Sequence, residues 1–151
     1  MKTPLTVLAC VFVAAAAVSC SSNIALTPNI PGSSAVADVA VAPTNLGDVV
    51  VDAKGMTAYV FDKDVAGSGS SECTGDCQRL WVAVPAASDQ PVAVGITPPV
   101  GVITGVGGGT QITIGGLPVY TFTGDSVPGD TNGQLFKDVW HALASSGQEI
   151  G

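Results

Sequence analysis

The chain has 151 residues, of which 46% are hydrophobic, 11% charged and 5% aromatic, and it contains 19 glycines and 10 prolines. This composition fits neither a charge-rich disordered chain nor a coiled coil. Five Lys and Arg residues against twelve Asp and Glu residues give a formal net charge of −7. That balance excludes a nucleic-acid partner, because such proteins carry a basic patch, and it disfavours other anionic partners.

Residues 1–19 have the pattern of a secretory signal peptide. Lys2 supplies a positive charge, Leu5–Val18 is an apolar run, and small residues precede Cys20. The run is shorter than the roughly 20 residues that a membrane-spanning helix needs. The segment resembles a bacterial lipoprotein signal, in which a peptidase cuts before a cysteine that carries a diacylglyceryl group on its sulfur. We therefore expect lipidation of Cys20, with plain secretion as the alternative because Ala17 stands where such signals usually have Leu.

Residues 20–45 are predicted to be the lipidated N-terminus and a flexible tether. This segment is rich in Ser, Ala, Pro and Asn and has no aromatic residue and no sustained alternation of apolar and polar residues. Two or more acyl chains hold a protein firmly at a membrane, whereas one does not. The expected location is therefore the outer face of the cytoplasmic membrane, or the medium if the protein is secreted without lipid.

Residues 46–147 are predicted to form one domain that contains the same unit twice, at about 46–85 and 108–145. Residues 49–64 align without a gap with residues 110–125. The matching landmarks are Tyr59 with Tyr120, Phe61 with Phe122, Asp64 with Asp125 and, further on, Trp81 with Trp140. Since an isolated hairpin is marginally stable, the two units are expected to share a core.

Each unit has the pattern of a β-hairpin. Strand-forming residues flank a turn at Lys54-Gly55 or at Gly115-Gly116. The aromatic pair of each unit lies two positions apart and so points to one face of the sheet, as core or as a shelf for a ligand. The aspartate that follows the pair is expected to form a turn or to accept the tyrosine hydroxyl. Val100–Thr104 is predicted as a further strand, and residues 78–82 as a short helical turn after two cysteines. The predicted fold is mainly β: a small antiparallel domain of two related hairpin repeats.

The repeated motif resembles the Y-x-(F/W/Y)-x-x-D signature of the secreted-repeat lipoprotein family. The segments 52–57, 73–81, 128–133 and 139–141 resemble that family in order and spacing. A departure follows Trp81, where Val82–Pro85 replaces the two prolines that many relatives carry. The resemblance implies an exported, usually lipid-anchored bacterial envelope protein, and it implies no established reaction.

Cys73 and Cys77 are the remaining thiols after export, apart from Cys20. In an oxidising compartment we expect a disulfide between them, which pins a turn and contributes about 2 kcal/mol. The alternatives are a redox-active pair, or a metal site completed by His141 and Met56. The spacing is not that of a thioredoxin motif, and no second cysteine pair is present to complete a zinc site.

The sequence offers few residues for catalysis. His141 is the single histidine, and no nucleophile-elbow motif accompanies it, so packing beside Trp140 is the expected role and enzymatic activity is not favoured. Asp125, Asp130 and Asn132 lie in a loop that contains Gly and Pro. Their oxygens suit calcium, although the order of ligands in an EF-hand is absent and the same residues form ordinary turns.

Besides a purely structural role, which makes no chemical prediction and holds by default, two functional hypotheses follow from the sequence. The first is a non-enzymatic binding or interaction module that is attached to the membrane through its lipid anchor and contacts an unidentified envelope protein or ligand. The second is an envelope redox or metal-handling protein that uses the cysteine pair and His141. No cofactor is predicted.

Overall fold

A computed structural model describes residues 36–151. The predicted signal peptide, Cys20 and most of the predicted tether lie outside these residues. No helix within 36–151 has the length and apolar character needed to cross a membrane. The strands are β1 (Val39–Thr44), β2 (Gly47–Asp52), β3 (Tyr59–Phe61), β4 (Trp81–Ala83), β5 (Val100–Thr104), β6 (Thr110–Ile114), β7 (Leu117–Pro118), β8 (Tyr120–Phe122) and β9 (Trp140–Ala142). Two short helical turns, α1 (Cys77–Leu80) and the 3-10 turn η1 (Phe136–Asp138), precede β4 and β9.

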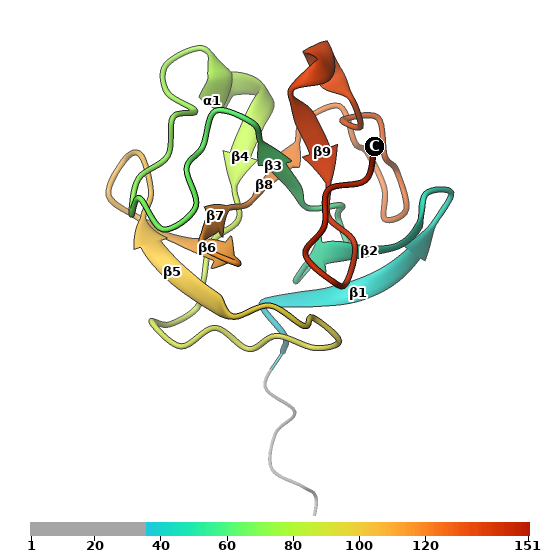
Figure 1. Ribbon diagram of the computed structural model, residues 1–151, viewed down its shortest axis with the longest axis horizontal. Coiled ribbons are helices and arrows are strands. Elements are labelled where there is room, and N and C mark those ends of the chain that lie inside the picture. The colour runs from blue at the N-terminus through green and yellow to red at the C-terminus, as the bar shows by residue number, and fades with distance from the viewer. Residues whose placement is uncertain (1–35) are drawn as a thin grey trace, which may run out of the picture. The chain divides into compact units, whose positions relative to one another are not determined.

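The fold is mainly β with antiparallel sheets, as the sequence predicts, and α1 is the helical turn expected after the cysteine pair. The strand predicted at Val100–Thr104 is β5 with the same bounds. The sheets are β1-β2, β5-β6-β7 and a central sheet in the order β4-β8-β3-β9. Figure 1 shows β3 and β8 near the middle of the domain, with α1 and β9 on either side.

The folded part begins earlier than the sequence suggests, because β1 lies within the segment predicted as a tether. β1 pairs with β2 along its whole length, and the N–H of Val39 donates to the carbonyl of Val92. The sequence of β1 does not alternate between apolar and polar residues, because Val and Ala occupy both faces of the strand. Tertiary pairing with the valines of β2 therefore decides that this segment is a strand.

The two predicted hairpins differ in extent. In the second repeat β6 pairs with β7 around Gly115-Gly116, and a Cβ on Gly116 would lie 2.8 Å from the backbone nitrogen of Gly67, so the turn needs glycine there. In the first repeat the turn forms, with Gly55 at φ +83°, but the pairing across it is a single bridge. The main partner of β2 is β1 instead.

The central sheet alternates between the two repeats. β4 and β3 belong to the first repeat, β8 and β9 to the second, and each pairs with strands of the other repeat. Tyr59 of β3 lies directly opposite Tyr120 of β8. Neither repeat therefore contains the pairing partners that its own central strands need.

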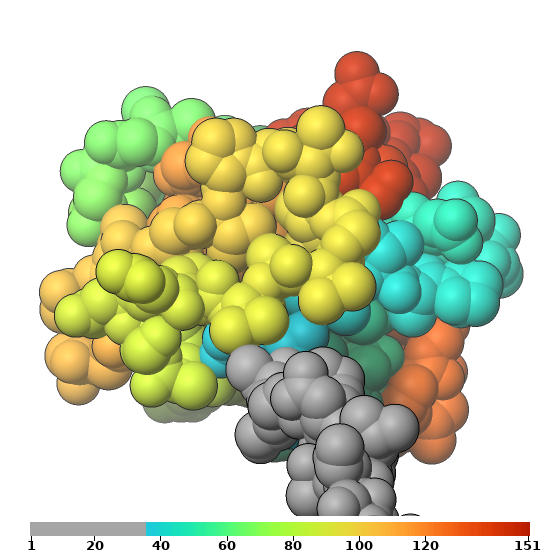
Figure 2. Space-filling model, turned by 90° about the horizontal axis from the view of Figure 1, so that it is seen from below, coloured from blue at the N-terminus to red at the C-terminus, as the bar shows by residue number. Residues whose placement is uncertain are grey.

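Two hydrophobic clusters form the core. The aliphatic cluster contains Val39, Val50, Ala58, Val60, Val84, Ile112, Ile114, Val119 and Leu143. The aromatic cluster contains Tyr59, Phe61, Cys73, Trp81, Tyr120, Trp140 and Ala142, with Phe122 and Phe136 packed against it. The segment between β4 and β6 lies beside β1 on the face seen in Figure 2, where it is yellow. The four strands of the central sheet thus bring the aromatic residues of both repeats into one cluster.

Candidate functional site

The aromatic cluster is built as a stack of four rings that alternates between the repeats. Trp81 and Trp140 stack face to face with centroids 3.6 Å apart and an interplanar angle of 4°. Phe61 stacks on Trp140 at 4.4 Å, and Phe122 lies on Trp81 at 4.6 Å. Each phenylalanine therefore packs on the tryptophan of the other repeat. Stacked aromatic pairs stabilise by about 0.5–1.5 kcal/mol beyond the burial of their area.

Each of the two motif tyrosines also forms a hydrogen bond with the other repeat. The hydroxyl of Tyr59 donates to Asp125 Oδ2 at 2.8 Å, and the hydroxyl of Tyr120 donates to Asp64 Oδ2 at 2.6 Å. Both tyrosines and both aspartates are buried. The expectation of an aspartate acceptor fits this arrangement, but each acceptor belongs to the repeat that does not contain the tyrosine.

The second oxygen of each carboxylate holds a loop. The N–H of Glu72 donates to Asp64 Oδ1 at 2.7 Å, and the N–H of Asn132 donates to Asp125 Oδ1 at 2.8 Å. Each aspartate thus ties the loop that follows its own strand to the tyrosine of the other repeat. Since every oxygen accepts a hydrogen bond, the burial of these carboxylates is compensated.

The same loops supply a second contact to each tyrosine hydroxyl. Ser71 Oγ lies 2.7 Å from the oxygen of Tyr120, and the N–H of Gly133 donates to the oxygen of Tyr59 at 3.2 Å. A Cβ on Gly133 would lie 2.8 Å from Trp81 and from Tyr59. Glycine is therefore needed where this loop crosses the aromatic cluster.

Burial dominates the electrostatics of this centre. It raises the pKa of Tyr59 and Tyr120 well above the ordinary value of 10.0, and the neighbouring carboxylates raise them further. Burial also raises the pKa of Asp64, against which the N–H of Glu72 and the hydroxyl of Tyr120 act by stabilising the carboxylate. Both tyrosines therefore stay protonated, as donation to the aspartates requires.

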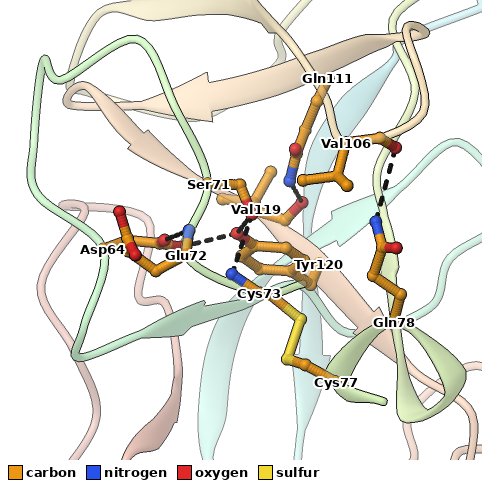
Figure 3. The surroundings of a disulfide bond; sticks show 10 residues. All are labelled: Asp64, Ser71, Glu72, Cys73, Cys77, Gln78, Val106, Gln111, Val119 and Tyr120. Carbon is orange, nitrogen blue, oxygen red and sulfur yellow. Dashed lines mark hydrogen bonds between the residues drawn. A yellow bond between two sulfur atoms is a disulfide. The ribbon is translucent and has the colours of Figure 1, made fainter. Parts of the chain in front are cut away.

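A disulfide supports the centre from the first repeat. Cys73 and Cys77 are bonded, with Cα atoms 5.2 Å apart, which confirms the predicted disulfide. The N–H of Cys73 donates to Ser71 Oγ at 3.1 Å, and Cys77 begins α1, which leads directly into Trp81. Figure 3 shows this disulfide next to Tyr120, Ser71 and Asp64. The bond therefore fixes the turn that places both Ser71 and Trp81.

A pocket of about 330 Å³ opens on the aromatic cluster, and we call it the aromatic pocket. It is lined by Phe61, Lys63, Asp76, Cys77, Leu80, Trp81, Phe136, Lys137, Val139 and Trp140. Lys63 Nζ lies 5.9 Å from the ring centroid of Phe61, and Lys137 Nζ lies 5.7 Å from that of Phe136. Within residues 36–151 neither lysine forms an ion pair. Both repeats contribute to this pocket, and it combines ring surface with two positive charges.

A second pocket, of about 220 Å³, lies next to Asp38, Asp52 and Lys54. Its carboxylates are engaged by backbone amides: Asp38 accepts from Ala87 and Val92, and Asp52 accepts from the turn that follows it. Its lining contains none of the Tyr, Phe, Asp and Trp landmarks that the two repeats share. We therefore take the aromatic pocket as the candidate site.

The structure separates the residues that the sequence offered as a metal site. Cys73 and Cys77 bond to each other, and Met56 lies in the turn after β2. His141 Nε2 lies 3.2 Å from Asp62 Oδ1. The group of potential ligands around His141, within the part of the chain that the structure describes, contains no cysteine.

The candidate calcium residues of the 125–132 loop make hydrogen bonds within the protein. Asp125 binds Tyr59 and Asn132 as above, and Asp130 Oδ2 accepts from the N–H groups of Ser126 and Val127. The Asn132 side chain donates to the carbonyl of Gly124 at 3.3 Å. These contacts are those of turn-forming residues.

Sequence reasoning missed the functional features that depend on exchange between repeats. Lys63 and Lys137 fall outside the repeated landmarks, and both line the aromatic pocket because η1 and the residues after β3 border it. The one signal for them is their rarity, since the chain has five Lys and Arg residues in all. Glu149, which is grouped with Asp62 and His141 in the structure, belongs to no motif of the sequence.

A family model described as a secreted repeat of unknown function matches the chain twice, over residues 40–85 and 101–144. The two matches coincide with the two units that exchange strands in the central sheet. Neither the curated proteins nor the solved structures provide a significant match.

Proposed function

Since the chain belongs to the family of secreted repeats of unknown function, we propose that it is a lipid-anchored, non-enzymatic binding module of the bacterial envelope. The proposed attachment is through lipid on Cys20, at the outer face of the cytoplasmic membrane. The pattern of residues 1–20 and the secreted character of the family support this location. The aromatic pocket is the proposed binding site.

The observation that carries the proposal is the pairing of a ring-lined pocket with two lysines that form no ion pair within the described residues 36–151. Phe136 supplies apolar surface together with the edges of Trp81 and Trp140, whose faces are covered within the stack. Pockets of this kind hold the apolar body of a ligand. Lys63 and Lys137 supply the charge that orients it. We infer a ligand with an apolar body and an anionic group.

The net charge of −7 opposes this ligand at long range, and the lysines favour it at short range. Charges separated by more than about 8–10 Å are largely screened at physiological salt, so the local pair decides binding. Asp76 at the pocket is already paired with Arg79 at 3.3 Å. The non-enzymatic role is supported by the position of His141, which contacts Asp62 and is absent from the pocket lining.

A matched pair of fluorescent probes tests the proposal. Anilinonaphthalene sulfonate has a flat apolar body and a sulfonate, and phenylnaphthylamine has the same body without the charge. We expect the sulfonate to bind one per chain and to quench the fluorescence of the two tryptophans. Replacing both pocket lysines, Lys63→Glu with Lys137→Glu, is expected to weaken its binding at least about tenfold, or ~1.4 kcal/mol.

The control variant is Lys54→Glu, which makes one substitution of the same kind outside the aromatic pocket. It is expected to bind the sulfonate like the unaltered protein. Equal binding of the two probes, or equal loss in the control and the double variant, would reject the ligand class. Turnover of a substrate that depends on His141 would reject the non-enzymatic role.

The anchor has its own test. Mass spectrometry of the protein purified from membranes of a lipoprotein-producing bacterium is expected to show a diacylglyceryl group on Cys20. Cys20→Ser is expected to lose the lipid and to leave the membrane fraction. An unmodified mature protein in the medium would show plain secretion instead.

A further inference from the structure

We propose that Asp62, His141 and Glu149 form a binding site for a divalent metal ion of the zinc type. Asp62 directly follows β3, His141 lies in the middle of β9, and Glu149 belongs to the segment that follows β9. One potential ligand atom from each lies within 4.8 Å of the others. Imidazole nitrogen and carboxylate oxygen are both ligands of Zn²⁺, and open zinc sites use three protein ligands with a water in the fourth position.

The spacing of the ligand atoms fits a tetrahedral ion. His141 Nε2 and Asp62 Oδ1 are 3.2 Å apart. Two ligand atoms that each lie about 2.0–2.2 Å from a tetrahedral zinc ion are roughly 3.4 Å apart. Binding therefore requires a shift of a few tenths of an ångström between these two atoms. Glu149 is exposed and can move onto the ion.

The other nitrogen of His141 fixes the orientation of the ring. Nδ1 lies 3.3 Å from the carbonyl oxygen of Ile150, and because a carbonyl oxygen can only accept, Nδ1 carries the proton of this hydrogen bond. The N–H of Ile150 donates to the carbonyl of Ala142 at 2.9 Å, and the Gln134 side chain donates to the Ile150 carbonyl. This arrangement leaves Nε2 as the nitrogen that faces the carboxylates, and second-shell carbonyls hold metal-binding histidines in the same way.

The charges of the site also call for a cation. Within residues 36–151, no Lys or Arg forms an ion pair with Asp62 or Glu149. A protonated His141 would balance one of the two carboxylates, whereas a divalent ion beside a neutral imidazole balances both. The His141 side chain is 14% exposed and that of Asp62 is 37% exposed, so the site is open to ions from solvent.

The metal site is separate from the aromatic pocket. Phe61 and Trp140, which lie opposite each other in β3 and β9, line the pocket. Asp62 and His141 are the next residues along, and successive side chains of a strand point to opposite faces. No residue is shared between the two sites, so failure of one proposal leaves the other standing.

Calorimetric titration with zinc chloride tests the site, using the full-length exported protein without a polyhistidine tag. We expect one Zn²⁺ per chain with a dissociation constant of about 10 μM or below. His141→Gln, Asp62→Asn and Glu149→Gln are each expected to weaken binding about tenfold or more. The matched controls are Glu72→Gln, which changes the other glutamate of the chain, and the exposed Asp89→Asn. Both controls are expected to bind like the unaltered protein.

The single histidine gives a second, direct measurement. In nitrogen-15 NMR spectra, zinc is expected to shift the Nε2 resonance of His141 while Nδ1 keeps its proton. Thermal unfolding without zinc checks that each variant is folded. No saturable binding in the unaltered protein, an unshifted Nε2 resonance at saturating zinc, or equal affinity in the folded His141→Gln variant would each overturn the proposal.

Discussion

The two repeats have the same residues at the positions that contact the other repeat. They differ in the turns that precede their tryptophans. Tyr, Phe, Asp and Trp occur in both, and each side makes the same exchanged contacts. The turn before Trp81 is α1 closed by a disulfide, whereas the turn before Trp140 is η1, with Phe136 packed on the cluster. Contacts between repeats thus constrain the motif more than contacts within a repeat do.

Removing either central tryptophan is expected to have the largest effect. Trp81→Ala and Trp140→Ala should each lower the free energy of unfolding by about 3–5 kcal/mol. Trp81→Ala should cost more, because Trp81 also packs edge-on against Phe136. Urea unfolding followed by circular dichroism measures both, with Trp→Phe variants as milder forms. A larger loss for Trp140→Ala would show that the contact of Trp81 with Phe136 contributes less than the contacts of Trp140 with Phe61 and Tyr120.

The exchanged tyrosines predict a loss of stability in alkali. The chain has two tyrosines, and their pKa values are raised in the folded state above the ordinary 10.0. As the pH rises through 10, the unfolded chain loses protons that the folded chain retains, so stability falls, by about 2.7 kcal/mol in total for the pair between pH 9 and 11. Denaturant unfolding between pH 9 and 11 measures the slope. Tyr59→Phe should halve it, and a flat profile would contradict the burial of both hydroxyls.

The different supports of the two turns can be compared directly. Replacing the disulfide, Cys73→Ser with Cys77→Ser, is expected to cost about 2 kcal/mol. Leu keeps much of the apolar volume of Phe136. Phe136→Leu should therefore lower the free energy of unfolding by less than loss of the disulfide does, by about 1 kcal/mol. Thermal unfolding measures both. Similar losses would mean that packing supports the second turn as strongly as the covalent bond supports the first.

Double-mutant cycles sharpen the comparison at single contacts. Tyr59→Phe and Asp125→Asn share a hydrogen bond, so their effects on stability should be coupled by about 1 kcal/mol. Tyr59→Phe and Asp64→Asn lie in the same repeat and share no partner, so their effects should add within about 0.5 kcal/mol. The opposite pattern of coupling would place each hydrogen bond within its own repeat.

The smallest expected effect concerns strain in the second turn. Leu135, Lys137 and Asp138 have positive φ, at 56°, 53° and 57°, a conformation that disfavours residues with a Cβ. Lys137→Gly should therefore stabilise the protein by up to about 1 kcal/mol while it weakens binding of the sulfonate probe. Chemical denaturation and fluorescence titration of the same sample measure both changes. A destabilised variant would show that the Lys137 side chain contributes packing that outweighs its strain.

The sequence predicted the local features that depend on a few neighbouring residues. The turn at Gly115-Gly116, the strand at Val100–Thr104 and the disulfide follow from residue type and spacing. It missed β1, whose Val and Ala residues carry no alternation. The alternative metal site grouped His141 with the cysteines, because a sequence shows which potential ligands exist and does not show which of them lie close together.

By itself, the sequence determined that the chain carries an export signal pattern, a duplicated unit and a mainly β fold. Each of these depends on the type and spacing of residues that are near one another in the chain. The tertiary structure decided which repeat supplies each partner. An aligned motif looks the same whether Tyr59 binds Asp64 or Asp125, and the choice depends on the sheet order β4-β8-β3-β9. That order arises from pairing between distant strands, and it brings together the tryptophans, the two pocket lysines, and the carboxylates around His141.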